Sequence, residues 1–206
     1  MELTQQDFKS ATSAVASKAM RNELNALIEG IEDPNAKRAF EAEMSSFYHL
    51  FNRFLAEKAK GVKLDWDKIQ PPAAEQVTPY ASLPQATDPS VLNKLAVLKL
   101  NGGLGTTMGC TGPKSIIEVR EGMTFLDMSV RQIEHLNGTY NVNVPFILMN
   151  SFNTDDDTAR VIQKYANHNV EIMTFNQSRY PRINRDTLLP CPRSATSNKN
   201  LWYPPG

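Results

Sequence analysis

Residues 1–60 alternate apolar and polar positions with the period of an α-helix. Thr4 and Asp7 are spaced as a capping box, and Asp33 followed by Pro34 is typical of an N-cap and a first-turn proline. The pattern therefore predicts two helices. In the second, apolar side chains recur at alternating spacings of four and three residues, which places them on one stripe that packs against a neighbour. They are Phe40, Met44, Phe47, Phe51 and Phe54.

A proline-rich segment follows over residues 70–90. Its prolines remove main-chain donors and fix φ, so neither a helix nor a central strand is expected there. They are Pro71, Pro72, Pro79, Pro84 and Pro89. Apolar residues in and before the segment predict an extended connector that is anchored on the protein surface and keeps the N-terminal helices docked. These anchors are Trp66, Ile69, Val77, Tyr80 and Leu83.

Beyond the prolines, short apolar runs alternate with helical patterns. Strands are expected at 95–100, 144–150 and 170–175, and helices at 124–137 and 154–167. Both helices begin with the spacing of a capping box, Thr124 with Asp127 and Thr154 with Asp157. This order predicts an α/β fold with a mostly parallel sheet, which binds ligands at the carboxyl ends of its strands. The tail, 179–206, is expected to be loop. The predicted parts are a helical region (1–69), a connector (70–90) and the N-terminal part of a ligand-binding domain (91–206).

Composition and charge exclude several classes of protein. Hydrophobic residues make up 41% and charged residues 21%, which is typical of a folded globular chain. Lys plus Arg and Asp plus Glu number 22 each, so no overall field favours nucleic acid or an anionic membrane as a partner. Charges among the first residues argue against a signal peptide, and no apolar run reaches the ~20 residues of a membrane span. Only Cys110 and Cys191 occur, which favours a reducing, cytoplasmic location.

The densest chemical signal lies at residues 100–115, directly after a predicted strand. Five of the ten glycines fall within eleven positions there. Glycine lets main-chain N–H groups approach a ligand closely, and Lys114 adds a charge suited to phosphate. A glycine-rich turn is about as often only a tight connection, but its place after a strand and the lysine favour a nucleotide or phosphate loop. Pro113 stands where a Walker loop requires glycine, so the loop is not of the Walker type. The third glycine of a dinucleotide fingerprint is displaced to Gly109, so the standard dinucleotide-binding loop is excluded as well.

The loop LNGGLGTTMGCTGPKS resembles the nucleotide-binding signature of the eukaryotic UTP–glucose-1-phosphate uridylyltransferase (UDP-glucose pyrophosphorylase) family. Further segments resemble that family in the same order, at 124–127, 132–137, 149–154, 174–184 and 202–206, and more loosely at 51–58 and 65–70. The resemblance implies a Rossmann-like, glycosyltransferase-A-like nucleotidyltransferase fold. It also implies magnesium-dependent transfer of uridylyl from UTP to glucose 1-phosphate, giving UDP-glucose and pyrophosphate in carbohydrate and glycogen metabolism. A full-length chain is expected to form a homo-oligomer.

The same resemblance implies roles for individual residues. Main-chain groups of the loop would cradle the nucleotide, Lys114 would contact phosphate, and Gln177 would read uracil, for which a carboxamide offers both a donor and an acceptor. Gly102 and Gly103 would also lie near glucose 1-phosphate. The residues expected to bind UTP are Leu100, Asn101, Gly102, Gly103, Lys114, Gln177 and Gly206.

No residue is expected to act as a nucleophile or to bind a metal. Asp155, Asp156 and Asp157 form an acidic run, but they suit the first turn of a helix. His135 and His168 have no triad partner at a suitable spacing. Family members are longer and continue past Gly206 with His-Gly-Asp, so the resemblance implies a truncated, inactive form. The alternative is a non-catalytic nucleotide-binding or regulatory module that associates with full-length subunits.

Overall fold

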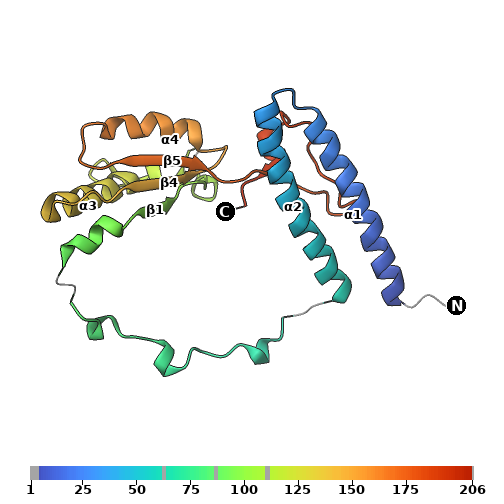
Figure 1. Cartoon of the computed structure of the whole chain (residues 1–206), viewed down its shortest axis with the longest axis horizontal. Coiled ribbons are helices and arrows are strands. Elements are labelled where there is room, and N and C mark those ends of the chain that lie inside the picture. Colours follow the sequence, from blue (N-terminus) through green and yellow to red (C-terminus); the bar gives the residue numbers. More distant parts are fainter. Residues whose placement is uncertain (1–4, 62–63, 86–87, 110–111, 206) are drawn as a thin grey trace.

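The computed structural model describes residues 5–61, 64–85, 88–109 and 112–205. Two long helices, α1 (Gln5–Glu29) and α2 (Pro34–Lys60), pack side by side as a hairpin (Figure 1). Asp33 caps α2, since its carboxylate accepts the Ala36 N–H at 2.7 Å and Pro34 occupies the first turn. The predicted helices and this cap are confirmed. The expected cap at Thr4 lies outside the described residues.

The buried stripe of α2 differs from the predicted one at its end. Phe40, Met44 and Phe51 are buried, but Leu55 takes the last position while Phe54 is 42% exposed. A step of four residues from Phe51 keeps the side chain on the face that α1 covers. We call the resulting cluster the helical core. It consists of Met20, Leu24, Leu27, Phe40, Met44, Phe51, Leu55 and Trp202.

Trp202 shows that the C-terminal tail belongs to this helical core. Its ring meets the Phe40 ring edge-on, with centroids 5.8 Å apart. Two short strands, β6 (Tyr180–Pro181) and β7 (Trp202–Tyr203), pair antiparallel within the tail. The expectation that the tail is only loop is therefore wrong, because an aromatic side chain far along the sequence completes a core that the two helices alone leave open.

A parallel sheet forms the second body of the molecule. Strands β1 (Val97–Leu100), β4 (Phe146–Asn150) and β5 (Ile172–Asn176) lie in the order β1-β4-β5. The hairpin of β2 (Glu118–Arg120) and β3 (Met123–Thr124) leads into α3 (Phe125–Tyr140). Helix α4 (Asp155–Val161) continues as a 3-10 turn, Ile162–Tyr165. The predicted α/β class, a parallel sheet preceded by a helical region, is confirmed.

The sheet has its own core, which α3 and β4 share. Alternate residues of β4 are buried, as a strand covered on that face requires. The buried apolar side chains of this sheet core are Leu126, Val130, Ile133, Val144, Phe146, Leu148 and Tyr165. Among the described residues, none of the helices combines the length and apolar character that a bilayer crossing requires.

The proline-rich connector does not lie on a surface. It runs as an arc away from both bodies (Figure 1), and its expected anchors are exposed, Trp66 by 73% and Tyr80 by 89%. Ile69, Val77 and Leu83 are also exposed. The prediction of burial is wrong. The segment forms short 3-10 helices at Trp66–Lys68, Ala74–Gln76, Tyr80–Ser82 and Pro89–Lys94. Each of them is too short to present a long apolar stripe, and the tail docks the helices instead.

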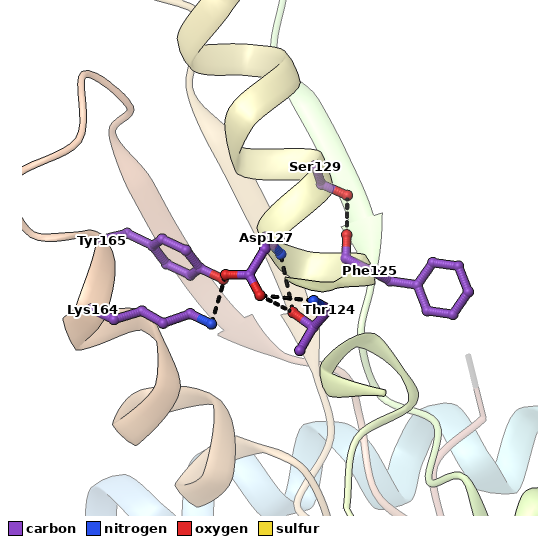
Figure 2. A network of polar contacts seen from close by, with 6 residues as sticks. All are labelled: Thr124, Phe125, Asp127, Ser129, Lys164 and Tyr165. Atoms are coloured by element: carbon purple, nitrogen blue, oxygen red, sulfur yellow. Dashed lines mark hydrogen bonds and ion pairs between the residues drawn. The ribbon is translucent and has the colours of Figure 1, made fainter. Parts of the chain in front are cut away.

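The start of α3 is tied to the turn after α4 through one carboxylate. Asp127 and Thr124 form the predicted capping box, with Asp127 accepting the Thr124 N–H at 2.8 Å and donating its own N–H to the Thr124 hydroxyl at 3.1 Å. The other Asp127 oxygen accepts the Tyr165 hydroxyl at 2.8 Å and lies 2.6 Å from Lys164 Nζ (Figure 2). Burial disfavours the Asp127 carboxylate, but these hydrogen bonds outweigh it and hold its pKa below its usual range. Burial, together with Asp127, raises the pKa of Tyr165.

The second predicted capping box does not form. The Thr154 hydroxyl accepts the N–H of Ser151 at 3.0 Å, and Asp157 pairs with Arg160. The prediction is wrong because the Thr154 hydroxyl bonds to the loop before α4 and not to the N–H of Asp157.

Replacing Asp127 by Asn is expected to lower the free energy of unfolding at pH 7 by about 1–3 kcal/mol, because the ion pair and capping bonds weaken. A carboxylate with a lowered pKa stabilises the fold above its unfolded pKa of about 3.9 and loses this effect as the pH falls below it. The gap between wild type and Asp127→Asn should therefore shrink from pH 7 to pH 3 in urea denaturation. Asp156→Asn, an exposed first-turn change, serves as the control. An equal gap at both pH values would contradict the assignment.

Candidate functional site

A pocket of about 380 Å³ opens at the carboxyl end of the sheet. Residues at the end of β1, near the end of β4 and directly after β5 contribute to it, as expected for a parallel sheet. The tail supplies the remaining wall. The lining residues are Leu100, Asn101, Gly102, Gly103, Lys114, Ser115, Met149, Gln177, Tyr203, Pro204 and Pro205.

The residues that the sequence marked as a candidate site meet in this pocket. Every one of them that the structure describes is among its lining residues, although Gln177 is far from the glycine loop in sequence. Gly206 lies outside the described residues, and its neighbours Pro204 and Pro205 belong to the wall. The structure thus brings these residues together, while their roles toward a ligand stay a prediction.

The glycine loop leaves the sheet and folds back beside its own start. The Asn101 N–H donates to the Met149 carbonyl at 2.8 Å, extending the pairing of β1 with β4. The returning chain is held by the Lys114 N–H, which donates to the Gly103 carbonyl at 3.1 Å. Gly109 has φ of +73°, a conformation that favours glycine and lets the chain turn. Lys114 is consequently held beside Gly103, and its side chain is exposed.

Two main-chain donors of the loop have no acceptor among the residues that the structure describes. The Gly102 carbonyl accepts the Ser151 hydroxyl at 2.8 Å, and the Gly103 carbonyl accepts the Lys114 N–H. The N–H groups of Gly102 and Gly103 donate to no acceptor within the described parts of the chain. Two adjacent main-chain donors beside a lysine form a suitable environment for an anion.

The side chain of Asn101 points away from this role and into the protein. It is 3% exposed, and its amide nitrogen donates to Asn150 Oδ1 at 2.7 Å and to Thr158 Oγ1 at 2.8 Å. Its carbonyl oxygen accepts the hydroxyl of Ser115. One carboxamide therefore joins the ends of β1 and β4, helix α4 and the residue after Lys114. The side chain of Asn101 is therefore engaged inside the protein, and the role proposed for its main chain toward a ligand stays a prediction.

Ser151 holds the loop from the other side. Its buried hydroxyl donates to the Gly102 carbonyl and accepts the Asn153 N–H at 3.2 Å. Residue types alone do not reveal Ser151 or the side-chain role of Asn101, because their partners are distant in sequence. The only signal was that segment 149–154 resembles the family.

The Gln177 carboxamide lies against the main chain of Gly102. The Gln177 N–H donates to the Asn150 carbonyl at 2.9 Å, which continues the pairing of β4 with β5. A Cβ on Gly102 would run into the carboxamide nitrogen of Gln177 and would lie 3.3 Å from Cβ of Ser151. The absence of a side chain at position 102 thus allows the carboxamide to rest on the loop.

The other candidate residues lie outside the pocket. The acidic run begins α4 as expected, with Asp155 accepting from Asn150 at 3.0 Å and Asp157 paired with Arg160. His168 contacts Glu134 at 3.0 Å. Among the described residues, no three His, Cys, Asp or Glu side chains gather where they could hold a metal ion. The magnesium site that the resemblance implies stays a prediction.

Comparisons with known proteins agree with one another. Residues 44–206 match the model of the UTP–glucose-1-phosphate uridylyltransferase family. A probable UTP–glucose-1-phosphate uridylyltransferase of Schizosaccharomyces pombe is 59% identical over 201 residues, which is 97% of this chain and 40% of that protein. The Saccharomyces cerevisiae enzyme of the same name is 54% identical over 201 residues, again 97% of this chain and 40% of that protein. The chain thus spans about 40% of the length of these relatives.

Solved structures show the same likeness. A UDP-glucose phosphorylase from Trypanosoma brucei is 31% identical with a TM-score of 0.63, covering 93% of this chain and 39% of that one. A mutant UDP-glucose pyrophosphorylase from Leishmania major, in complex with UDP-glucose, is 29% identical with a TM-score of 0.64 and covers 93% and 37%.

Gly102→Ala is expected to displace the Gln177 carboxamide, the mobile end of its side chain, and to destabilise the protein by about 1 kcal/mol, because the added methyl group also crowds Cβ of the buried Ser151. Gly138→Ala is the matched control: Gly138 lies in α3, exposed, with nothing within 4 Å of an added Cβ. That change should stabilise by about 0.5–1 kcal/mol. Urea denaturation measures both. If Gly102→Ala were stabilised as much as its control, the crowding against Ser151 would be refuted.

Proposed function

Because the chain belongs to the UTP–glucose-1-phosphate uridylyltransferase family, we propose that it forms the uridine-nucleotide-binding part of such an enzyme. The reaction proposed for the whole protein transfers uridylyl from UTP to glucose 1-phosphate and gives UDP-glucose and pyrophosphate. One observation carries the proposal for this chain. The glycine loop, Lys114 and Gln177, which are separate in sequence, line a single pocket at the carboxyl end of the sheet.

Gln177 is proposed to select the base. A carboxamide donates to a carbonyl oxygen of uracil and accepts from its N3–H, whereas cytosine presents a different pattern at the same edge. Tyr203, Pro204 and Pro205 offer the base ring an apolar wall. The pocket volume lies within the usual ~300–1,000 Å³ of small-molecule sites.

The loop is proposed to bind the phosphates. The N–H groups of Gly102 and Gly103 supply hydrogen bonds, and the ammonium group of Lys114 supplies a positive charge. The chain is neutral overall, so this attraction is local. Glucose 1-phosphate is proposed to lie beside Gly102 and Gly103, where its phosphate oxygen would approach the α-phosphorus of UTP. The contribution of these residues is positioning and charge stabilisation.

Magnesium is proposed to accompany the triphosphate, as it commonly does in nucleotide enzymes. The binding steps above use no metal ion. A cytoplasmic location and a place in carbohydrate metabolism, including glycogen synthesis, are proposed by analogy with the family. A homo-oligomer of the whole protein is likewise a proposal.

The pocket of this chain is proposed to bind nucleotide without completing the reaction. None of the described lining residues is an Asp, Glu or His. Incubated with UTP, glucose 1-phosphate and magnesium, the 206-residue chain is expected to form no UDP-glucose above background. Chromatographic detection of UDP-glucose measures this, with intact mass confirming the chain. Robust turnover would contradict the proposal. Nucleotide binding without turnover, together with co-purification of a longer homologue, would favour the non-catalytic module.

Substitutions at Lys114 and at Gln177 are expected to change nucleotide affinity in different ways. Lys114→Ala should weaken UTP and CTP alike by roughly 1.5–3 kcal/mol, because a charge-assisted phosphate contact is lost. Gln177→Ala should bring the two affinities together, because only the base contact changes. Isothermal titration with each nucleotide measures both effects.

Lys94→Ala is the control for charge, because this exposed lysine lies outside the pocket lining. Unchanged affinity in Lys114→Ala, or an equal loss for UTP and CTP in Gln177→Ala, would remove that residue from its proposed role.

A further inference from the structure

Three chain segments that border the pocket continue directly into contacts with the helical core. Ser151, which holds Gly102, is followed by Phe152, and Phe152 packs against that core. Gln177 is followed after two positions by Arg179, which contacts α2. Tyr203 of the pocket wall is preceded by Trp202, which is buried in the helical core. Figure 1 shows the tail running from the sheet to the side of α1 and α2.

The contact between α2 and the segment after Gln177 is polar and aromatic. The Arg179 N–H donates to Glu43 Oε1 at 3.2 Å. The guanidinium carbon of Arg179 lies 4.4 Å from the centroid of the Trp202 ring and 5.5 Å from that of Phe40. Burial raises the pKa of Glu43, and the main-chain bond and charge of Arg179 oppose this rise. Arg179 thus contacts Glu43 and Phe40 of α2 and also Trp202.

Aromatic contacts fix the same segments further. The Phe47 ring of α2 lies 5.6 Å from the Tyr180 ring, measured between centroids. Neighbouring residues of a strand point to opposite sides, so the burial of Trp202 against Phe40 directs Tyr203 toward the pocket. The antiparallel pair of β6 and β7 joins the two segments to each other.

We propose that α2 is a positioning element of the nucleotide pocket, with Phe40 and Phe47 acting through Arg179, Tyr180 and Trp202 on Gln177 and Tyr203. The inference rests on the proposed nucleotide binding. Phe40 and Phe47 are absent from the lining residues of the pocket, so any effect of these residues on a nucleotide must pass through its wall. Helix α2 then contributes, through the pocket wall, to the selectivity of the pocket for uracil over cytosine.

The test compares Phe40→Leu with Tyr48→Phe in the 206-residue chain. Leucine keeps an apolar side chain in the helical core but loses the ring contacts with Trp202 and Arg179. Tyr48 also lies on α2, and its hydroxyl bonds to Ser17 of α1 at 2.7 Å, so the control perturbs the hairpin and not the pocket wall. Isothermal titration with UTP and with CTP gives the affinity and the ratio between the two bases.

Phe40→Leu is expected to weaken UTP binding by roughly 2- to 30-fold and to lower the UTP-to-CTP ratio, whereas Tyr48→Phe leaves the ratio unchanged. A merely structural role would lower the folded fraction and leave that ratio intact. If Phe40→Leu does not fold, Phe47→Leu, at a partly buried position, is judged by the same ratio.

An unchanged ratio in a folded α2 variant that still binds UTP would overturn this inference and leave the proposed function standing. If the wild-type chain bound neither nucleotide, both would fall.

Discussion

The buried carboxamide of Asn101 is the contact on which the geometry of the site depends. It donates to Asn150 and Thr158 and accepts from Ser115, so that two strand ends, one helix and the return of the glycine loop are joined at one point. Each of these groups is buried, and a buried polar group without a partner costs about 1–3 kcal/mol. The penalty for breaking any one bond therefore keeps the whole set together. A loop rich in glycine, which has few side chains of its own to pack, is held in one conformation in this way.

Two separate cores give this arrangement its rigidity. The sheet core positions the strand ends from which the loop and Gln177 start, and the helical core holds the tail that forms the opposite wall. The pocket thus has walls from segments that belong to two different cores. Ser151 and Phe152, adjacent in sequence, contact the loop and the helical core respectively. A nucleotide in the pocket would touch segments fixed by both cores.

Local chemistry explains which features the sequence predicted. The caps at Asp33 and Thr124 depend on residues within a few positions, and both form as expected. The glycine loop lies at a strand end because a parallel sheet places such turns at one edge, so the location of the pocket also followed. Thr154 was misassigned because Ser151, just before it, competes for its hydroxyl. The prediction that the connector is buried on a surface is wrong, because apolar residues alone do not show whether another part of the protein lies close enough to cover them.

The remaining contacts depend on pairs that are far apart in sequence, such as Asn101 with Thr158. Neither hydrophobic periodicity nor motif spacing predicts contacts between residues that are so far apart in sequence. A crystal structure of the chain with bound UTP shows most directly whether the glycine loop and Gln177 form a nucleotide site. We expect uracil within hydrogen-bonding distance of Gln177, phosphate oxygens at Lys114 and the Gly103 N–H, and the Asn101 carboxamide still turned inward. A nucleotide bound elsewhere, or an Asn101 side chain released into the pocket, would contradict it.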